Sequence, residues 1–254
     1  MIKIENINVY GWEPAIRGMR NSKNSWMKSD SGVCATHGPA RCVDCVYTDC
    51  HADDVDISTK YILGPNDLNL MATLCNAGAD DSKFMRMIIV YLDITAPLYW
   101  WKEFDTYKVG TVVNSCSTMH KIHSKELTLD DFSCEHLMDD TINAEYDLDG
   151  CGAVICLNDT SAYTMSVDTV AVLNAYRKKY LETKDKRYWW QMIQLLPSSY
   201  NQKRTVMLNY QVLKNMYFAR KNHRLDEWRT FCEEVEKLPY FKEICIEPVS
   251  YKNC

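Results

Sequence analysis

The sequence predicts an α+β protein, rich in helix, in which helices pack around one central buried sheet. Of its 254 residues, 46% are hydrophobic and 25% are charged, as in ordinary globular domains. Only nine are glycine and seven are proline, which excludes a low-complexity chain. Residues 84–94 are dense in isoleucine, valine, tyrosine and methionine, whereas most other apolar residues recur at helical spacing. We expect a single domain over residues 1–254 with a cysteine-rich insertion at about 30–63.

The first third of the chain predicts a strand, a helix, a long loop and a second helix. Residues 9–12 suit a short strand, and residues 15–20 suit a short helix. Residues 30–63 are rich in Cys, Asp, Gly and Thr without an apolar period, which predicts a loop insertion. The next helix begins near Gly64 and ends at Gly78, because glycine is favoured just after a helix. Its apolar face consists of Leu68, Met71, Ala72 and Cys75.

The middle of the chain predicts the central strand and further helices. Residues 84–94 indicate a strand that is buried on both faces. Pro97 can occupy the first turn of a helix over residues 98–108. The polar stretch that follows allows a helix around residues 127–137. A clearer helix is predicted over residues 168–181, with one apolar side made of Val172, Ala175 and Tyr176.

Two more helices are predicted towards the C-terminus, after a segment that ends at Pro197. The first covers residues 205–220, and its apolar stripe consists of Leu208, Val212, Leu213, Met216 and Tyr217. The second covers residues 226–238, and its inward side chains are Trp228, Phe231, Cys232 and Val235. The tryptophan pairs at 100–101 and 189–190 are expected in the core.

The charge pattern narrows the range of partners. The net charge is −5, with 29 basic and 34 acidic residues and no long run of one sign. A binder of duplex nucleic acid usually has a basic excess or a basic stripe, so no nucleic-acid partner is expected. A small anionic ligand needs only two or three well-placed cations. The most apolar region is broken by Arg86, Asp93 and Pro97, and no apolar signal core follows Met1, so we expect a cytoplasmic protein without a membrane partner.

The twelve cysteines fall into two groups. Eight are scattered through ordinary helix and strand sequence, and we interpret them as reduced, mostly buried thiols. The other four, Cys34, Cys42, Cys45 and Cys50, lie within 17 residues of the polar insertion and include one Cys-x2-Cys pair. This spacing suits a closed structural zinc site, in which His37 or His51 can replace one thiolate, most readily that of Cys50. Free thiols or a redox pair are the alternatives.

Two blocks of the sequence resemble the flavin-dependent thymidylate synthases. In the first, Ala96-Pro97 precedes Lys102-Glu103-Phe104, which resembles an Arg-Gln-aromatic group of that family. Further positions resemble the family's second motif, which has an Arg-His-Arg triplet followed by serine, asparagine and a second serine. They are, in order, Lys108, Thr111, Asn114 and Ser117, with one inserted residue between Thr111 and Asn114.

The second block lies near the C-terminus. Leu196-Pro197 stands twelve positions before Asn209, and Arg220 follows Asn209 by eleven positions. The family's Leu-Pro, Asn and Leu-Arg elements have this spacing. The segment 226–228 resembles the acidic and aromatic residues that come after them.

The resemblance implies an enzyme that binds FAD and a pyrimidine deoxynucleotide and transfers a one-carbon unit from folate to the base. In that family the cofactors carry the hard chemistry, NADPH supplies the electrons and the protein is a homotetramer. The implied substrate-binding residues are Arg220, Lys102, Glu103 and Ser117. The implied cofactor-binding residues are Lys108, Thr111, Asn114 and Asn209. No catalytic side chain is identified.

Several family residues are missing. Thr106 and Tyr107 stand in place of an arginine and a histidine, Ile193 replaces another arginine, and Gly78-Ala79 replaces a Gly-His pair. Lysine is a point charge without the planar fork of arginine, so the lysines change how a phosphate is held. The alternative is therefore a divergent protein without the usual activity, acting as a nucleotide-binding or zinc-stabilised interaction module. Arg220 could also be an ordinary solvated surface arginine.

Overall fold

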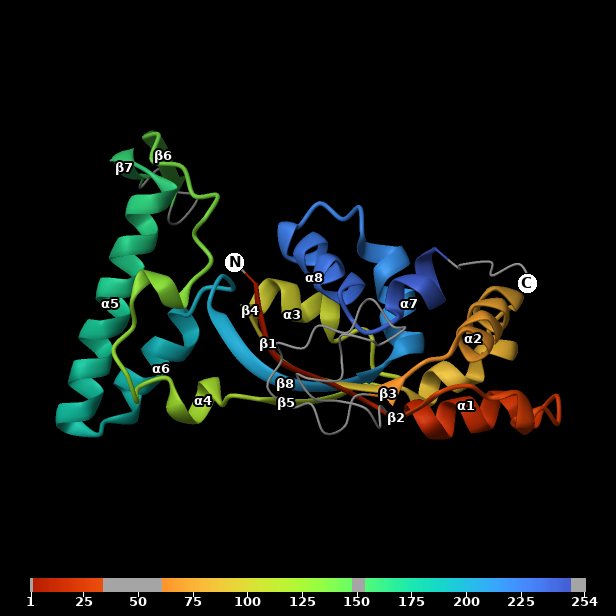
Figure 1. The fold of residues 1–254 in the computed structure, drawn as a ribbon. Coiled ribbons are helices and arrows are strands. Elements are labelled where there is room, and N and C mark those ends of the chain that lie inside the picture. The colour runs from red at the N-terminus through yellow and green to blue at the C-terminus, as the bar shows by residue number, and fades with distance from the viewer. Residues whose placement is uncertain (1, 34–60, 148–153, 248–254) are drawn as a thin grey trace, which may run out of the picture.

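The computed structural model describes residues 2–33, 61–147 and 154–247. Its main body is a four-stranded antiparallel sheet with strand order β1-β4-β8-β5. The strands are β1 (Lys3–Tyr10), β4 (Ile89–Pro97), β8 (Asn201–Asn209) and β5 (Val112–Ser115). Figure 1 shows this sheet curving beneath helices α3, α7 and α8. The strand expected over residues 9–12 is present but lies further towards the N-terminus, because it ends at Tyr10 and Trp12 already belongs to a helix.

Among the described residues, helices bury only one face of the sheet. Along β4, Val90, Leu92 and Ile94 are buried, whereas Tyr91 on the opposite face is 42% exposed. The prediction of a strand buried on both faces is wrong, because the strand alternates and the helices cover one side. Its predicted first residues instead form a 3-10 helix, η4 (Asp81–Met87).

Three helices cover the inner face. They are α3 (Leu98–Phe104), α7 (Tyr210–Arg220) and α8 (Asp226–Glu236). Their side chains form an aromatic cluster of Trp100, Trp101, Phe104, Trp228 and Phe231, all at most 1% exposed. The helix predicted over 98–108 ends early, since a turn at Asp105 and a positive φ of 76° at Gly110 lead the chain away. Lys108 therefore lies in a loop.

The boundary between β8 and α7 corrects a second prediction. Residues 205–209 were expected to open a helix, but they complete β8, and Val206 and Leu208 point into the core as alternate strand residues. The helix begins at Tyr210 because the side chain of Asn209 accepts a hydrogen bond from the Val212 amide, at 3.0 Å. The last predicted helix is confirmed as α8, with its four inward side chains buried.

Two helices pack beside one end of the sheet, α1 (Trp12–Asn21) and α2 (Pro65–Ala77). The predicted end of α2 at Gly78 is confirmed, and this glycine has a φ of 136°. Between the helices, β2 (Gly32–Val33) pairs with β3 (Tyr61–Ile62). This short ladder joins the two ends of the predicted insertion. The zinc site predicted at Cys34, Cys42, Cys45 and Cys50 lies outside the described residues.

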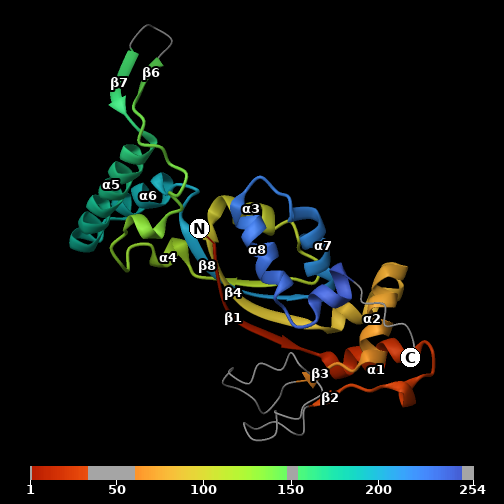
Figure 2. The same cartoon turned by 45° about the horizontal axis from the view of Figure 1, so that its top comes forward.

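A lobe with its own helices and a hairpin lies beside the sheet (Figures 1 and 2). A second apolar cluster holds it together and consists of Ile122, Leu127, Phe132, Leu173 and Met192. The lobe contains α4 (Thr118–Lys121), η5 (Leu129–Asp131), α5 (Ala162–Thr183), α6 (Lys186–Leu195) and the hairpin of β6 (Ile142–Asp147) and β7 (Val154–Thr160). Two short elements lie elsewhere, η1 (Trp26–Lys28) and η6 (Lys242–Ile246).

The lobe confirms one predicted helix and overturns several details. Residues 168–181 are helical within α5, but Leu173 is its buried residue, whereas Val172 is 43% exposed and Ala175 is also exposed. The helix allowed around 127–137 is reduced to the single turn of η5. Trp190, expected in the core, is 42% exposed. Across the described ranges, no helix has both the length and the apolar character needed to span a membrane.

Candidate functional site

Glu103 and Arg220 form the centre of the candidate site. Nη1 of Arg220 lies 2.9 Å from Oε2 of Glu103. The same carboxylate oxygen accepts a hydrogen bond from Nε1 of Trp228, at 3.0 Å, and lies 3.5 Å from Nε2 of His223. We call these residues, together with Tyr107, the Glu103–Arg220 cluster. It joins the last turn of α3, the last turn of α7 and the first turn of α8.

The guanidinium of Arg220 is held in a defined orientation. Its Nε donates to the hydroxyl of Tyr107, at 3.1 Å, and its plane lies 4.9 Å from the ring centroid of Trp228. Trp228 is itself fully buried and packs against Trp100. Cation–π contact and two polar contacts therefore fix the group. The Arg220 side chain is 22% exposed and is therefore not the ordinary solvated surface arginine considered as the alternative from the sequence.

The cluster can bind one more anion. A guanidinium has five N–H donors, and in the described part of the chain those of Arg220 meet only Tyr107 and Glu103. The remaining donors suit a phosphate or carboxylate oxygen. Glu103 already neutralises the charge, however, so the anion would bind an ion pair rather than an isolated cation.

Two predicted cofactor residues lie at the other end of α7. Asn209 is 8% exposed and caps the helix. A Cβ on Gly110 would lie 2.8 Å from Nδ2 of Asn209, so the loop after Tyr107 passes close to this cap. The hydroxyl oxygen of Thr111 is buried and has no hydrogen-bond partner among residues 2–33, 61–147 and 154–247. This loop thus follows α7 from the Glu103–Arg220 cluster to Asn209, and it ends at an unsatisfied hydroxyl.

The other predicted residues lie on exposed positions. Asn114 belongs to β5, and Ser117 caps α4 by accepting a hydrogen bond from the His120 amide, at 3.1 Å. Lys102 and Lys108 are exposed, and no ion pair joins either of them to the described residues. The structure therefore brings Glu103 and Arg220 together and places Thr111 near Asn209. Neither lysine forms a hydrogen bond or ion pair with the described residues of the cluster.

Sequence reasoning missed Arg204, a cation close to β5. Its guanidinium lies 4.2 Å from the ring centroid of Trp101, and its Nη1 donates to Asp105 at 2.8 Å. On β8 it pairs with Ser115 of β5, two residues before Ser117. The sequence feature that could have identified Arg204 is the alternation of polar and apolar residues over 201–209. It becomes apparent only when that segment is interpreted as a strand.

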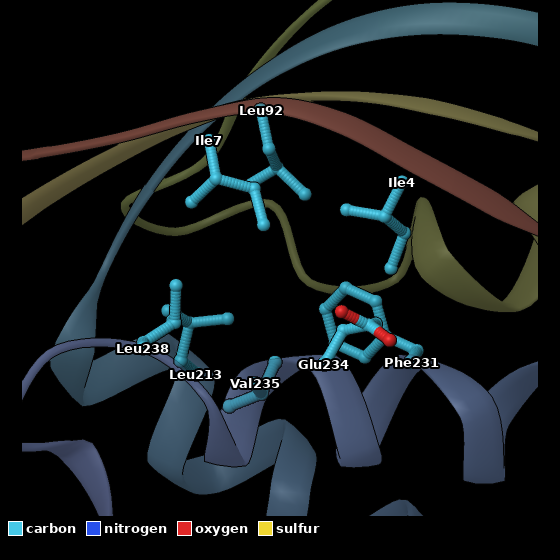
Figure 3. Close-up of a pocket in the computed structure, with 8 residues that line it drawn as sticks. All are labelled: Ile4, Ile7, Leu92, Leu213, Phe231, Glu234, Val235 and Leu238. Atoms are coloured by element: carbon cyan, nitrogen blue, oxygen red, sulfur yellow. The ribbon is translucent and has the colours of Figure 1, made fainter. Parts of the chain in front are cut away.

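An apolar hollow lies between the sheet and the last two helices (Figure 3). Ile4, Ile7 and Leu92 of the sheet face side chains of α7, α8 and the turn after α8, which are Leu213, Phe231, Glu234, Val235 and Leu238. The carboxylate of Glu234 pairs with Lys237, at 2.6 Å. None of the described residues that line this hollow is a cation, so we do not assign a phosphate-bearing ligand to it. In the described ranges, no three His, Cys, Asp or Glu side chains are grouped so that they could hold a metal ion.

Comparison with known proteins gives a fold relationship. Neither the protein-family models nor the curated protein sequences contain a match. Among solved structures, the chain resembles thymidylate synthase X (ThyX) from Helicobacter pylori with FAD and dUMP, with a TM-score of 0.60 and 14% identity over 97% of this chain and 98% of that one. A second structure of this flavin-dependent enzyme, also complexed with FAD and dUMP, gives a TM-score of 0.58 and 14% identity. The chain therefore has a fold of the flavin-dependent thymidylate synthase type.

Proposed function

We propose that the protein binds FAD and a pyrimidine deoxynucleotide and transfers a one-carbon unit from folate to the base. The observation that carries this proposal is the Glu103–Arg220 cluster. It presents a fixed and partly exposed guanidinium in a chain whose fold resembles enzymes crystallised with FAD and dUMP. The same arginine stands at the position that the sequence resemblance indicates for the nucleotide.

In this proposal Arg220 binds the phosphate of the nucleotide. Tyr107 and Trp228 hold the guanidinium plane, so little side-chain freedom is lost when the anion binds. Lys102 and Ser117 are the other proposed substrate contacts. Glu103 belongs to the proposed substrate site by positioning Arg220.

The loop and strand edge near Asn209 fit the phosphates of FAD. The buried hydroxyl of Thr111 has no hydrogen-bond partner among the described residues, so it can donate to a phosphate oxygen. Lys108 adds an exposed positive charge. Asn114 has an exposed side-chain amide on β5. The side chain of Asn209 packs closely against the loop at Gly110. When bound, reduced flavin supplies a hydride, and NADPH is the proposed source of its electrons. In this proposal the protein residues bind the cofactor and the nucleotide and orient them towards each other.

A homotetramer is the proposed assembly. The outer sheet face exposes Tyr91, which belongs to the central strand β4, and the edge residue Val112 is 61% exposed. Apolar residues on an uncovered sheet commonly mark an interface. Zinc bound by the insertion cysteines remains a separate proposal, which metal analysis of protein purified without chelator tests.

A protein with this fold that binds nucleotide without the usual reaction is the second candidate. One observation favours it. Arg220 is paired with Glu103, whose negative charge weakens the electrostatic attraction between Arg220 and a phosphate. The two candidates differ in one assay. The enzyme converts dUMP to its methylated product when folate, FAD and NADPH are supplied, whereas the binding protein retains dUMP unchanged.

Flavin binding has its own test. Titration of FAD into the purified protein, followed by flavin fluorescence and visible absorption, is expected to show saturable binding. Lys108→Met is expected to weaken FAD binding, and Lys102→Met is expected to weaken nucleotide binding alone. Because both lysines are exposed, neither change is expected to move the melting temperature. Protein that ignores added FAD would refute the flavin assignment.

A further inference from the structure

Three side chains outside the candidate site form a compact cluster beneath α2. Nζ of Lys214, on α7, donates to the carbonyl oxygen of Cys75 at 2.8 Å and lies 3.1 Å from its Sγ. Cys245, in η6, belongs to the same buried core cluster as Cys75, and each of the two thiols shifts the pKa of the other. Cys75 is 2% exposed and Cys245 is 4% exposed. We call these three residues the Cys75 cluster.

The surroundings favour a thiolate at Cys75. The hydrogen bond from Cys245 and then the Lys214 ammonium lower the pKa of Cys75 to about 6, although burial acts in the opposite direction. The pKa of Cys245 is raised, first by the same hydrogen bond and then by burial. One sulfur therefore carries the charge and the other the proton, as in reactive dithiol pairs.

A second buried cysteine provides the contrast. Cys232, on α8, is 3% exposed, and its sulfur lies 3.9 Å from the carbonyl oxygen of Tyr217. Burial, followed by the Glu236 and Glu233 carboxylates, raises the pKa of Cys232 to about 12, and Lys221 offsets only part of this rise. Of the six cysteines in these ranges, all are free thiols and only three are buried. Burial alone therefore does not produce the state of Cys75.

We propose that Cys75 and Cys245 form a reversible disulfide, with Cys75 as the attacking thiolate and Lys214 as its counter-ion. The bond would join the last turn of α2 to η6, which lie 170 positions apart in the sequence. The proposal does not depend on the function proposed above.

Hydrogen peroxide is the oxidant class that suits a buried pair, because it is nearly as small as water. The Cys75 thiolate attacks one peroxide oxygen, the O–O bond breaks, and the leaving hydroxide takes a proton to become water. The Cys245 sulfur then attacks the Cys75 sulfenic acid, an S–S bond forms, and the sulfenic oxygen leaves as a second water. Two thiols and one peroxide thus give one disulfide and two waters.

The test is peptide mapping after limited oxidation of the full-length protein. Treatment with one equivalent of hydrogen peroxide, followed by alkylation, is expected to give a Cys75–Cys245 disulfide that dithiothreitol reverses, while Cys232 stays alkylatable. This comparison needs no variant. Oxidation of Cys232 at the rate of Cys75, or a Cys75 bonded to any group other than Cys245, would overturn the proposal.

Three variants test the roles of the individual residues. At pH 7 a thiol with a pKa near 6 is about 90% thiolate, against about 1% for one near 9, a difference of about 90-fold. Lys214 is only one of the two groups that lower the pKa of Cys75, so Lys214→Met is expected to slow Cys75 oxidation by part of this factor, roughly ten-fold. Lys214→Arg is expected to restore most of the rate. In Cys245→Ser, Cys75 is expected to accumulate as a sulfenic acid, which dimedone traps when the oxidised protein is unfolded in its presence. An unchanged rate in Lys214→Met, or no trapped adduct in Cys245→Ser, would contradict the assigned roles.

Discussion

Nε of Arg20 lies 2.6 Å from Oδ1 of Asp67, and neither side chain is more than 4% exposed. The other oxygen of Asp67 accepts hydrogen bonds from Ser29 and Ser31 and from the Asp30 amide, at 2.7–3.1 Å. This carboxylate therefore ties α1 and α2 to the segment that leads into the insertion. A buried, hydrogen-bonded ion pair of this kind stabilises a fold chiefly because breaking it is costly.

Asp67→Ala is expected to lower the free energy of unfolding by about 3–5 kcal/mol, because it leaves the Arg20 charge buried and unpaired. Urea denaturation followed by circular dichroism measures the change. Asp80→Ala is the matched control, because the Asp80 side chain is fully exposed and its one ion pair in the described ranges, with Lys83, is long at 3.9 Å. That control is expected to change stability by less than about 0.5 kcal/mol. Equal losses in the two variants would contradict the role of Asp67.

Asp67 also gives the stability of the protein a defined dependence on pH. Burial opposes its ionisation, but hydrogen bonds from Ser31, Ser29 and Arg20 outweigh burial and lower the pKa of Asp67. A lowered folded-state pKa contributes stability above the unfolded pKa, near 3.8, and this contribution is lost as pH falls through the folded value. The difference in unfolding free energy between wild type and Asp67→Asn is therefore expected to be constant above about pH 5 and to shrink below pH 4. A difference that grows on acidification would contradict this.

Gly110→Ala is expected to disturb the loop that carries Thr111. The glycine has a φ of 76°, and an added Cβ would lie 2.8 Å from the Asn209 side chain. We expect a loss of about 1–2 kcal/mol in unfolding free energy together with weaker FAD binding. Gly32→Ala is the control, because its Cβ would meet nothing within 4 Å. Weakened FAD binding in the control alone would refute the placement of the cofactor.

Glu103→Gln separates positioning from charge. The amide can still accept from Arg220 and Trp228, but the negative charge next to the proposed phosphate is removed. Nucleotide affinity is expected to rise by about 1 kcal/mol, roughly five-fold, because the pair is partly exposed and the gain is screened. Calorimetry measures this change, and a loss of affinity would show that the Glu103 carboxylate itself binds the ligand.

Much of the fold could be predicted from the sequence, but the site could be predicted only in part. Helices with a clear apolar face, such as α2 and α8, were found because periodicity and end signals agreed. The stretch 205–209 was misread, since Leu208 fits the helical stripe of α7 as well as the alternation of β8. Family spacing selected both Glu103 and Arg220. Their mutual contact could not be predicted, because it joins positions 117 residues apart through the packing of Trp228.

Tyr107 shows a further limit of sequence reasoning. The sequence presents it only as a departure from the family, in place of a histidine. In the structure its hydroxyl accepts a hydrogen bond from Arg220 and helps to orient the guanidinium. From the sequence alone, the loss of a family residue cannot be distinguished from its replacement by a residue that takes over a role in the site.

Calorimetric titration of dUMP into FAD-saturated protein tests the central claim most directly. Wild type is expected to bind, and Arg220→Ala is expected to weaken binding by about 2 kcal/mol, roughly 30-fold, because a charged partner of the phosphate is lost. Arg187→Ala, which removes an exposed arginine paired with Asp185 in the lobe, is expected to bind as wild type does. Absence of dUMP binding by wild type, or equal affinity in wild type and Arg220→Ala, would contradict the account.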